Sequence, residues 1–295
     1  MSLLFQLLAA GVVTGCIYAL AALGFVLIYK SSRVINFAHG QLIAVGAFIA
    51  LALTQRGLNF WLSALIAMTL TFFLGMLIER FFLRRMVGQP IISVIMVTIG
   101  LASVLDGLMY LTPYASSNNS YPFSFTGSVN FAGISLSSAE LFAVAATLIF
   151  LGGFTYFFNK STLGVSMRAV SDDQMAAQSV GTSVQRVFAL AWAAAGLSAA
   201  AAGLILGLKS GLSLAGLAGI GLKVFPVVIL GGLDSVLGAV VGGIIIGIVE
   251  NLASGYLDTL VPGGGTGAVL PFAVLLVVLL VKPYGLFGTR EIERV

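Results

Sequence analysis

Long apolar runs separated by short polar segments make up most of this chain. They occupy residues 5–29, 34–53, 60–83, 91–111, 141–158, 187–208, 214–233, 236–252 and 269–281. A helix needs about 20 residues to cross roughly 30 Å of hydrocarbon, and a backbone in lipid must satisfy its own hydrogen bonds. The pattern therefore predicts an all-α integral membrane protein, a polytopic helical bundle of about eight to nine spans. The short alternating strands of a β-barrel are not apparent.

Composition supports a membrane protein in one domain, residues 1–295. Hydrophobic residues make up 59% of the 295 positions and charged residues 8%, whereas soluble proteins carry about 25% charged residues. The net charge of +4 fits loop lysines and arginines that face an anionic lipid surface, and no nucleic-acid patch is evident. Residues 1–29 lack a basic n-region and a cleavage site, which predicts a first span and not a removable signal. The single cysteine, Cys16, excludes an internal disulfide.

Positive charge predicts the orientation of the loops. Lysine and arginine cluster after the first, third and fifth runs and at the C-terminus, whereas the segments 112–138 and 255–266 contain neither. The positive-inside rule therefore places the polar stretch 160–186 and the C-terminus in the cytoplasm. Nine full crossings put the N-terminus outside. Eight crossings with an inside N-terminus are the alternative, if the glycine-rich segment 204–233 is re-entrant or the second run is broken.

The stretch 160–186 contains the signals of a short helix. Ser171 is a candidate N-cap, Gln174 follows three residues later as in a capping box, and Gly181 is a stop signal. Asp172 and Asp173 lie where the helix dipole favours anions. A helix of about two turns is too short to be stable alone, so other parts of the molecule must hold it.

This short helix carries a small apolar face, formed by Met175, Ala176 and Val180. The paired alanines Ala176 and Ala177 would let another surface approach closely. One interpretation is a docking peg for a partner. The other is an ordinary solvated loop between two spans.

The second run contains a polar cluster near one membrane face. Asn36, His39 and Gln41 bring hydrogen-bonding side chains to this depth, with Gly40 among them. Such groups are costly in lipid unless they face protein or a water-filled cavity. Either the helix is interrupted near His39 and Gly40 and lines a pathway, or these residues lie at the headgroup level as an interfacial cap. A lone histidine without a second ligand nearby is a poor metal candidate.

Small residues recur in two ways, between the two halves of the chain and at every fourth position within single runs. Gly40, Gly46 and Ala47 share their spacing with Gly232, Gly238 and Ala239, which is a weak internal repeat of the kind that transporters contain. Small residues also recur every fourth position, which predicts a helix face for close packing in lipid. These are Ala191, Ala195, Ala199, Gly203, Gly207 and Gly211, with shorter sets at Gly11 and Gly15 and at Gly238 and Gly242.

Motifs for self-contained chemistry are absent from the sequence. The sequence contains no G-x-x-x-x-G-K-[ST], G-x-S-x-G or H-E-x-x-H. It therefore offers no candidate residues for binding nucleotide phosphates or for hydrolytic or metal-dependent catalysis. Asp106, Asp234 and Glu250 fall near the ends of predicted spans, and no carboxylate is clearly placed at mid-membrane, where ion-coupled carriers usually keep one. These absences argue against catalysis and against self-powered secondary transport. If the chain moves a solute uphill, we expect its energy source to be a separate protein at the cytoplasmic face. An ion-coupled secondary carrier and a passive channel or structural membrane subunit stay open as alternatives.

Several motifs resemble one transporter family. The run GCIYALAALGFVLIYKSSRVINFAHGQLIAVGAF is similar to the N-terminal signature of the LivH family, the permease subunits of branched-chain amino-acid ABC importers of the bacterial inner membrane. MRAVSDDQMAAQSVGTSVQRV resembles the family's cytoplasmic coupling loop. GLKVFPVVILGGLDSVLGAVVGG and KPYGLFG also fit, so that the likeness spans nearly the whole chain. Similar permeases import urea, short amides or other amino acids, and these substrates remain alternatives.

The resemblance implies a set of partners and of site residues. The partners are a second permease subunit (LivM-like), two cytoplasmic ATPase subunits (LivG/LivF-like), which would use ATP and Mg²⁺, and a periplasmic amino-acid-binding protein; no cofactor is expected on this chain. The residues that it implies for contact with the ATPases are Arg168, Ser171, Asp172, Asp173, Gln174, Met175, Ala176, Ala177, Val180 and Gly181. The predicted translocation path contains Asn36, His39, Gly40 and Gln41, with Gly232 and Gly238 opposite.

Overall fold

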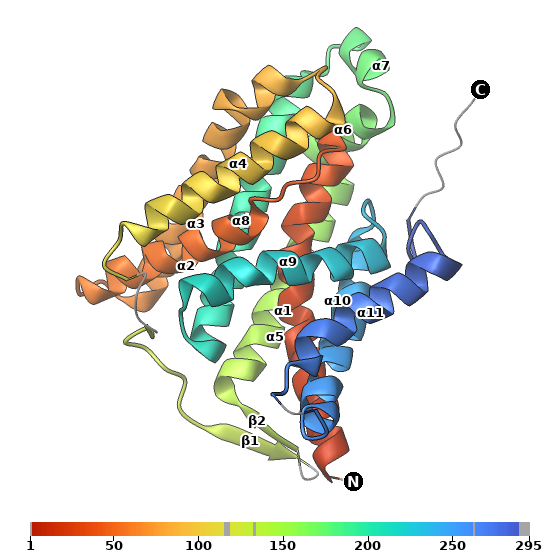
Figure 1. Cartoon of the computed structure of the whole chain (residues 1–295). Coiled ribbons are helices and arrows are strands. Elements are labelled where there is room, and N and C mark those ends of the chain that lie inside the picture. Colours follow the sequence, from red (N-terminus) through yellow and green to blue (C-terminus); the bar gives the residue numbers. More distant parts are fainter. Residues whose placement is uncertain (1, 115–118, 132–133, 262, 289–295) are drawn as a thin grey trace. The chain divides into compact units, whose positions relative to one another are not determined.

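The computed structural model describes residues 2–114, 119–131, 134–261 and 263–288, most of them in helices (Figure 1). The chain begins with α1 (Ser2–Ser32), α2 (His39–Gln55), α3 (Phe60–Phe81), the 3-10 turn η1 (Leu83–Met86) and α4 (Ile91–Tyr110). Next come strands β1 (Ser128–Phe131) and β2 (Ile134–Ser137), then α5 (Ser138–Lys160), α6 (Thr162–Asp172) and α7 (Gln174–Ser179). The last elements are α8 (Val184–Ser210), α9 (Leu214–Gly231), α10 (Val236–Leu252), the π-helical η2 (Ala253–Leu257) and α11 (Thr266–Val281).

Each of the nine apolar runs forms a helix, as predicted. Seven helices among the described residues are long and apolar enough to cross a membrane, and α2 and α11 are shorter apolar helices. The protein is therefore a multi-pass helical membrane protein. The glycine-rich segment 204–233 is divided between α8 and α9, because Gly211 turns the chain with φ 77°.

The structure corrects two details of the predicted elements. The second run becomes helical only at His39. Residues 33–38 are not helical, and the break begins at Arg33, which has a left-handed backbone with φ 55°. The segment 112–138 contains a β-hairpin where no strand was predicted. In this hairpin Val129 pairs with Leu136, antiparallel, and strands of four residues are too short for a clear alternating pattern. Two of the C-terminal arginines used for the orientation, Arg290 and Arg294, lie outside the described residues.

The described residues form two compact units. One is drawn from residues 1–22, 125–148 and 223–295, and the other from residues 23–124 and 149–222. We call them unit 1 and unit 2. The helices α1, α5 and α9 each contribute to both.

In unit 2, α2, α3 and α8 pack side by side (Figure 1). Their backbones approach closely at glycines: a Cβ on Gly75 of α3 would lie 2.2 Å from the carbonyl oxygen of Trp192 on α8. The small-residue face predicted on α8 is buried in this packing from Ala191 to Gly207. Small residues allow the close helix contacts that stabilise bundles in lipid, where burial of apolar surface contributes little.

In unit 1, the first part of α1 packs against α10. A Cβ on Gly15 would lie 2.6 Å from the Cα atom of Ile244, so the two helices touch backbone to backbone. The turn after α11 closes this unit by donating hydrogen bonds to the end of α9, from the N–H of Leu286 to the carbonyl of Leu230 (2.8 Å) and from Phe287 to Gly231 (3.0 Å). The motif KPYGLFG thus contacts the motif that contains ILGG.

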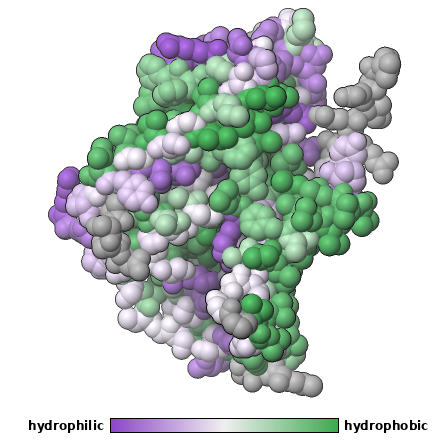
Figure 2. Space-filling view, viewed as in Figure 1, coloured by the Kyte–Doolittle hydropathy of each residue, from purple (hydrophilic) through white to green (hydrophobic). Residues whose placement is uncertain are grey.

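Apolar side chains cover the outer surfaces of α4 and α11 (Figure 2). Ile92 on α4 is 71% exposed and Leu280 on α11 is 87% exposed. Large apolar side chains at such exposure are typical of surfaces that contact lipid or a partner subunit.

Candidate coupling and translocation sites

The helix predicted in the stretch 160–186 is α7, and its N-cap is Asp173. The Asp173 carboxylate accepts hydrogen bonds from the N–H groups of Met175 (2.8 Å) and Ala176 (2.9 Å). Ser171 and Asp172 instead lie in the last turn of α6, so the predicted N-cap at Ser171 and its capping box with Gln174 are wrong. The reason is the backbone: it becomes extended only at Asp173, with φ −154° and ψ 111°, and an N-cap needs that conformation.

The predicted stop at Gly181 is confirmed. Gly181 has φ 87°, which glycine adopts without the steric penalty of a side chain. Its N–H donates to the carbonyl of Gln178, and the N–H of Thr182 donates to that of Ala177, both at 2.9 Å. This pair of hydrogen bonds is a Schellman motif and satisfies the last carbonyl groups of α7.

The two sides of α7 differ sharply. Met175 and Val180 are 80% and 81% exposed, and Ala176 is exposed as well, so the predicted apolar face points away from the protein. Ala177 is buried instead, which corrects the prediction that both alanines face a partner. It packs in a cluster that holds α7 onto α5, α6 and α8, formed by Phe158, Met167, Val170, Ala177, Val184, Val187, Phe188 and Ala191.

Arg168 contributes to the anchoring of α6. Its Nη1 donates a hydrogen bond to the backbone carbonyl oxygen of Phe158 at the end of α5. Its guanidinium also lies over the aromatic ring of Phe158, 5.4 Å from the ring centroid. Lys30 approaches this ring as well, at 4.8 Å. The observed contacts of Arg168 are thus internal to unit 2.

A pocket of about 160 Å³ lies beside α7 in unit 2. Gln174 is its contribution from α7, and Phe188 and Trp192 of α8 form part of its wall. Glu79 also lines it and receives two hydrogen bonds from Arg84, at 3.2 and 2.8 Å. Gln174 thus belongs both to α7 and to the lining of this pocket.

The polar residues predicted on the path gather at the start of α2. Asn36 and His39 are buried, and the Asn36 side-chain oxygen accepts a hydrogen bond from the N–H of Ala38 at 3.0 Å. The His39 ring lies edge-on to Phe25, with centroids 6.4 Å apart. The Asn36 amide nitrogen and the Gln41 side-chain oxygen have no hydrogen-bond partner in the part of the chain that the structure describes. The interruption of the helix before His39 is observed, and its role in a pathway stays a prediction.

The glycines predicted on the path all make close backbone contacts. A Cβ on Gly40 would lie 2.8 Å from the Cα atom of Gly221 within unit 2. In unit 1, a Cβ on Gly238 would lie 2.1 Å from the carbonyl oxygen of Gly231, and Gly232 has φ 107° and meets the backbone of Gly288. These backbone contacts are enough to explain why each position needs glycine, and no bound ligand is required for the explanation.

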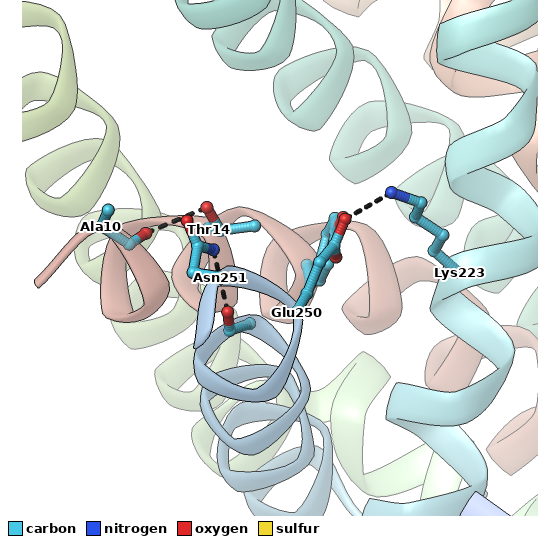
Figure 3. A network of polar contacts seen from close by, with 7 residues as sticks. Ala10, Thr14, Lys223, Glu250 and Asn251 are labelled. Atoms are coloured by element: carbon cyan, nitrogen blue, oxygen red, sulfur yellow. Dashed lines mark hydrogen bonds and ion pairs between the residues drawn. The ribbon is translucent and has the colours of Figure 1, made fainter. Parts of the chain in front are cut away.

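Unit 1 contains a cluster of polar side chains that the sequence pattern did not predict (Figure 3). Lys223 lies at the middle of α9 and forms an ion pair with Glu250 of α10, with Nζ and Oε1 2.5 Å apart. Tyr18 of α1 donates a hydrogen bond to the other carboxylate oxygen at 2.6 Å. The isolated lysine in an apolar run was the signal that could have pointed to this cluster.

The position of Glu250 corrects the prediction that it lies near the end of a span. The π-helix η2 continues α10, so the apolar helix extends from Val236 to Leu257. Glu250 therefore lies about two turns inside it. Figure 3 shows Lys223 directed toward Glu250, while the amide of the neighbouring Asn251 donates to the carbonyl of Gly247 at 2.9 Å.

Comparisons with known proteins identify the family. Residues 7–279 match the family model described as "Branched-chain amino acid transport system / permease component". The chain is 32% identical to the high-affinity branched-chain amino acid transport system permease protein LivH of Escherichia coli K12, over 97% of this chain and 96% of that protein. It is 29% identical to BraD of Pseudomonas aeruginosa, a permease protein of the same description, over 98% and 97% of the two chains. No solved structure gives a significant match. The chain belongs to the LivH family of branched-chain amino acid transport system permease components.

Proposed function

We propose that this protein is the membrane-spanning permease subunit of an ATP-driven importer for branched-chain amino acids. The observation that carries this proposal is α7. It is capped at both ends, anchored through Ala177, and exposes Met175, Ala176 and Val180 to a partner. A rigid exposed helix of this kind can transmit motion from an ATPase to the spans.

The mechanism follows from the way α7 is held. Because α7 packs against α5, α6 and α8, a force on its exposed face moves these helices together. Closure of two cytoplasmic ATPases would thus tilt unit 2 as a rigid body and open the path alternately to the two sides. ATP and Mg²⁺ would bind to the ATPases, since this chain has no phosphate-binding motif.

The proposed complex contains a second permease subunit, two ATPase subunits and a periplasmic amino-acid-binding protein. The family supports this kind of assembly. The distribution of lysine and arginine supports an inner-membrane protein with α7 and the C-terminus in the cytoplasm.

Ion-coupled carriage is the competing mechanism, and the Lys223–Glu250 pair argues against it. A proton or a sodium ion on Glu250 would replace Lys223 as the partner of the carboxylate and would leave the Lys223 ammonium without its counter-charge, beside the hydrogen bond that Glu250 accepts from Tyr18.

The test is uptake by proteoliposomes that contain the complete complex, with the binding protein and labelled leucine, isoleucine or valine outside and ATP inside. We expect accumulation that needs ATP hydrolysis and persists when ionophores collapse the ion gradients. The chain reconstituted alone should not concentrate any amino acid. Accumulation by the chain alone, or loss of uptake with the gradients, would overturn the proposal; uptake of urea or short amides in place of amino acids would overturn its substrate.

A further inference from the structure

Lys223 and Glu250 place two opposite charges well inside apolar helices. A charged side chain in the bilayer core costs several kcal/mol unless it is paired or faces a water-filled cavity. Here the carboxylate of Glu250 is satisfied on both oxygens, by the Lys223 ammonium and the Tyr18 hydroxyl. The pair is thus tolerated at this depth.

Stability alone is a weak reason for such a pair. The cost of removing two charges from water often exceeds their attraction, and an apolar pair of similar volume serves helix packing as well or better. α1 and α10 already pack closely at Gly11 and Gly15. The two charges must therefore be considered for what they could bind.

The pair is not sealed inside the protein. The side chain of Lys223 is 30% exposed and that of Glu250 is 15% exposed. Exposed charges are unfavourable next to hydrocarbon. A solute with one positive and one negative group could pair its positive group with Glu250 and its negative group with Lys223. The main chain of an α-amino acid carries these two charges, an ammonium and a carboxylate on one carbon atom.

We propose that Lys223 and Glu250 form a transient binding site for the zwitterionic main chain of the transported amino acid. The solute carboxylate binds the ammonium of Lys223, the solute ammonium binds the carboxylate of Glu250, and Tyr18 holds Glu250 in place. The ion pair opens to admit the solute and closes when it leaves, so the site remains neutral throughout. This proposal rests on the proposed function and adds that the path recognises the group common to all α-amino acids.

The test compares two single variants with a double variant in the complete complex. K223M and E250Q each leave one charge without its partner, and we expect ATP-dependent leucine uptake to fall at least tenfold in both. The variant K223M/E250Q contains neither charge. A purely structural ion pair predicts that this double variant recovers most of the uptake, because no unpaired charge remains. A zwitterion site predicts that uptake stays at least tenfold below that of the wild type.

Assembly and solute chemistry supply the controls. The double variant must elute with its partner subunits, as the wild type does. D106N removes a carboxylate from α4 and should transport normally. Isoamylamine lacks the carboxylate and 4-methylpentanoate lacks the ammonium, so neither should compete with leucine for transport. Recovery of uptake in the double variant, or competition by either analogue equal to that of valine, would overturn the proposal. Absence of ATP-driven uptake in the wild type would instead remove the function on which it rests.

Discussion

Met175 and Ala177 lie two residues apart on α7, yet Met175 is 80% exposed and Ala177 is 3% exposed. One side of this helix is fixed in the protein, and the other is available to a partner. Since residues two apart on a helix point about 200° away from one another, a substitution on either side tests a different property.

A bulky charge on the exposed face should uncouple the complex. In A176R the arginine side chain would hold the ATPase surface away from α7, and we expect amino-acid uptake to fall at least tenfold while ATP hydrolysis continues. Uptake and hydrolysis measured in the same proteoliposomes give the coupling ratio. Q178R adds the same group to α7 two residues further on. This control variant should keep the coupling ratio of the wild type. Uptake at the wild-type rate in A176R would show that α7 is not the docking surface.

The N-cap of α7 should matter more than the serine before it. Removal of the Asp173 carboxylate in D173A leaves the N–H groups of Met175 and Ala176 without their partner, a loss of about 1 kcal/mol for a typical N-cap. Hydrogen exchange of these two amides should accelerate about fivefold, and the coupling ratio should fall. S171A alters a residue inside α6 and should change neither quantity. Equal effects of the two variants would contradict the assignment of the cap.

His39 should affect the rate of transport and not the choice of amino acid. The residue is buried at the start of α2, and H39A leaves a cavity beside Phe25 without adding a selective group. We expect slower uptake of leucine, isoleucine and valine in unchanged proportions, as measured by competition among the three. A changed order of preference would show that the path itself selects among the side chains.

Close packing of α1 and α10 makes Gly247 sensitive to a single methyl group. A Cβ at this position would lie 2.4 Å from the backbone nitrogen of Gly15, and overpacking typically costs 1–3 kcal/mol. G247A should therefore lower the melting temperature of the purified protein in detergent. G100A makes the same change on α4, where a Cβ would meet nothing within 4 Å, and should be neutral or slightly stabilising because alanine favours helix. Similar melting temperatures for the two variants would refute this packing.

Asp258 links stability to pH in the loop before α11. Hydrogen bonds from the hydroxyl and the N–H of Thr266 hold the pKa of Asp258 below its usual value. A carboxyl group whose pKa is lower in the folded state stabilises that state above its unfolded pKa, near 3.9, and this contribution is lost as the pH falls through the folded value. D258N should thus melt below the wild type at pH 6, with a smaller difference below pH 4. A difference that does not depend on pH would exclude the carboxylate as its cause.

The sequence predicted the helices well, because hydropathy over some 20 residues is a strong local signal. The stop at Gly181 was also predictable, since glycine has a local backbone reason to be there. The sequence pattern predicts an N-cap at Ser171 and the structure has it at Asp173, because serine and aspartate can both cap a helix and only the backbone conformation decides between them. The pairing of Lys223 with Glu250 depends on two different helices, and the depth of Glu250 depends on the π-helix η2; neither follows from local pattern.

The contact between α1 and α10 also has a consequence for biosynthesis. Gly11 and Gly15 are synthesised long before Gly243 and Gly247, whose backbones they contact. The glycine face of α1 therefore lacks its partner helix until α10 has been synthesised. Unit 1 is completed only when Leu286 and Phe287 have been made and bind the end of α9.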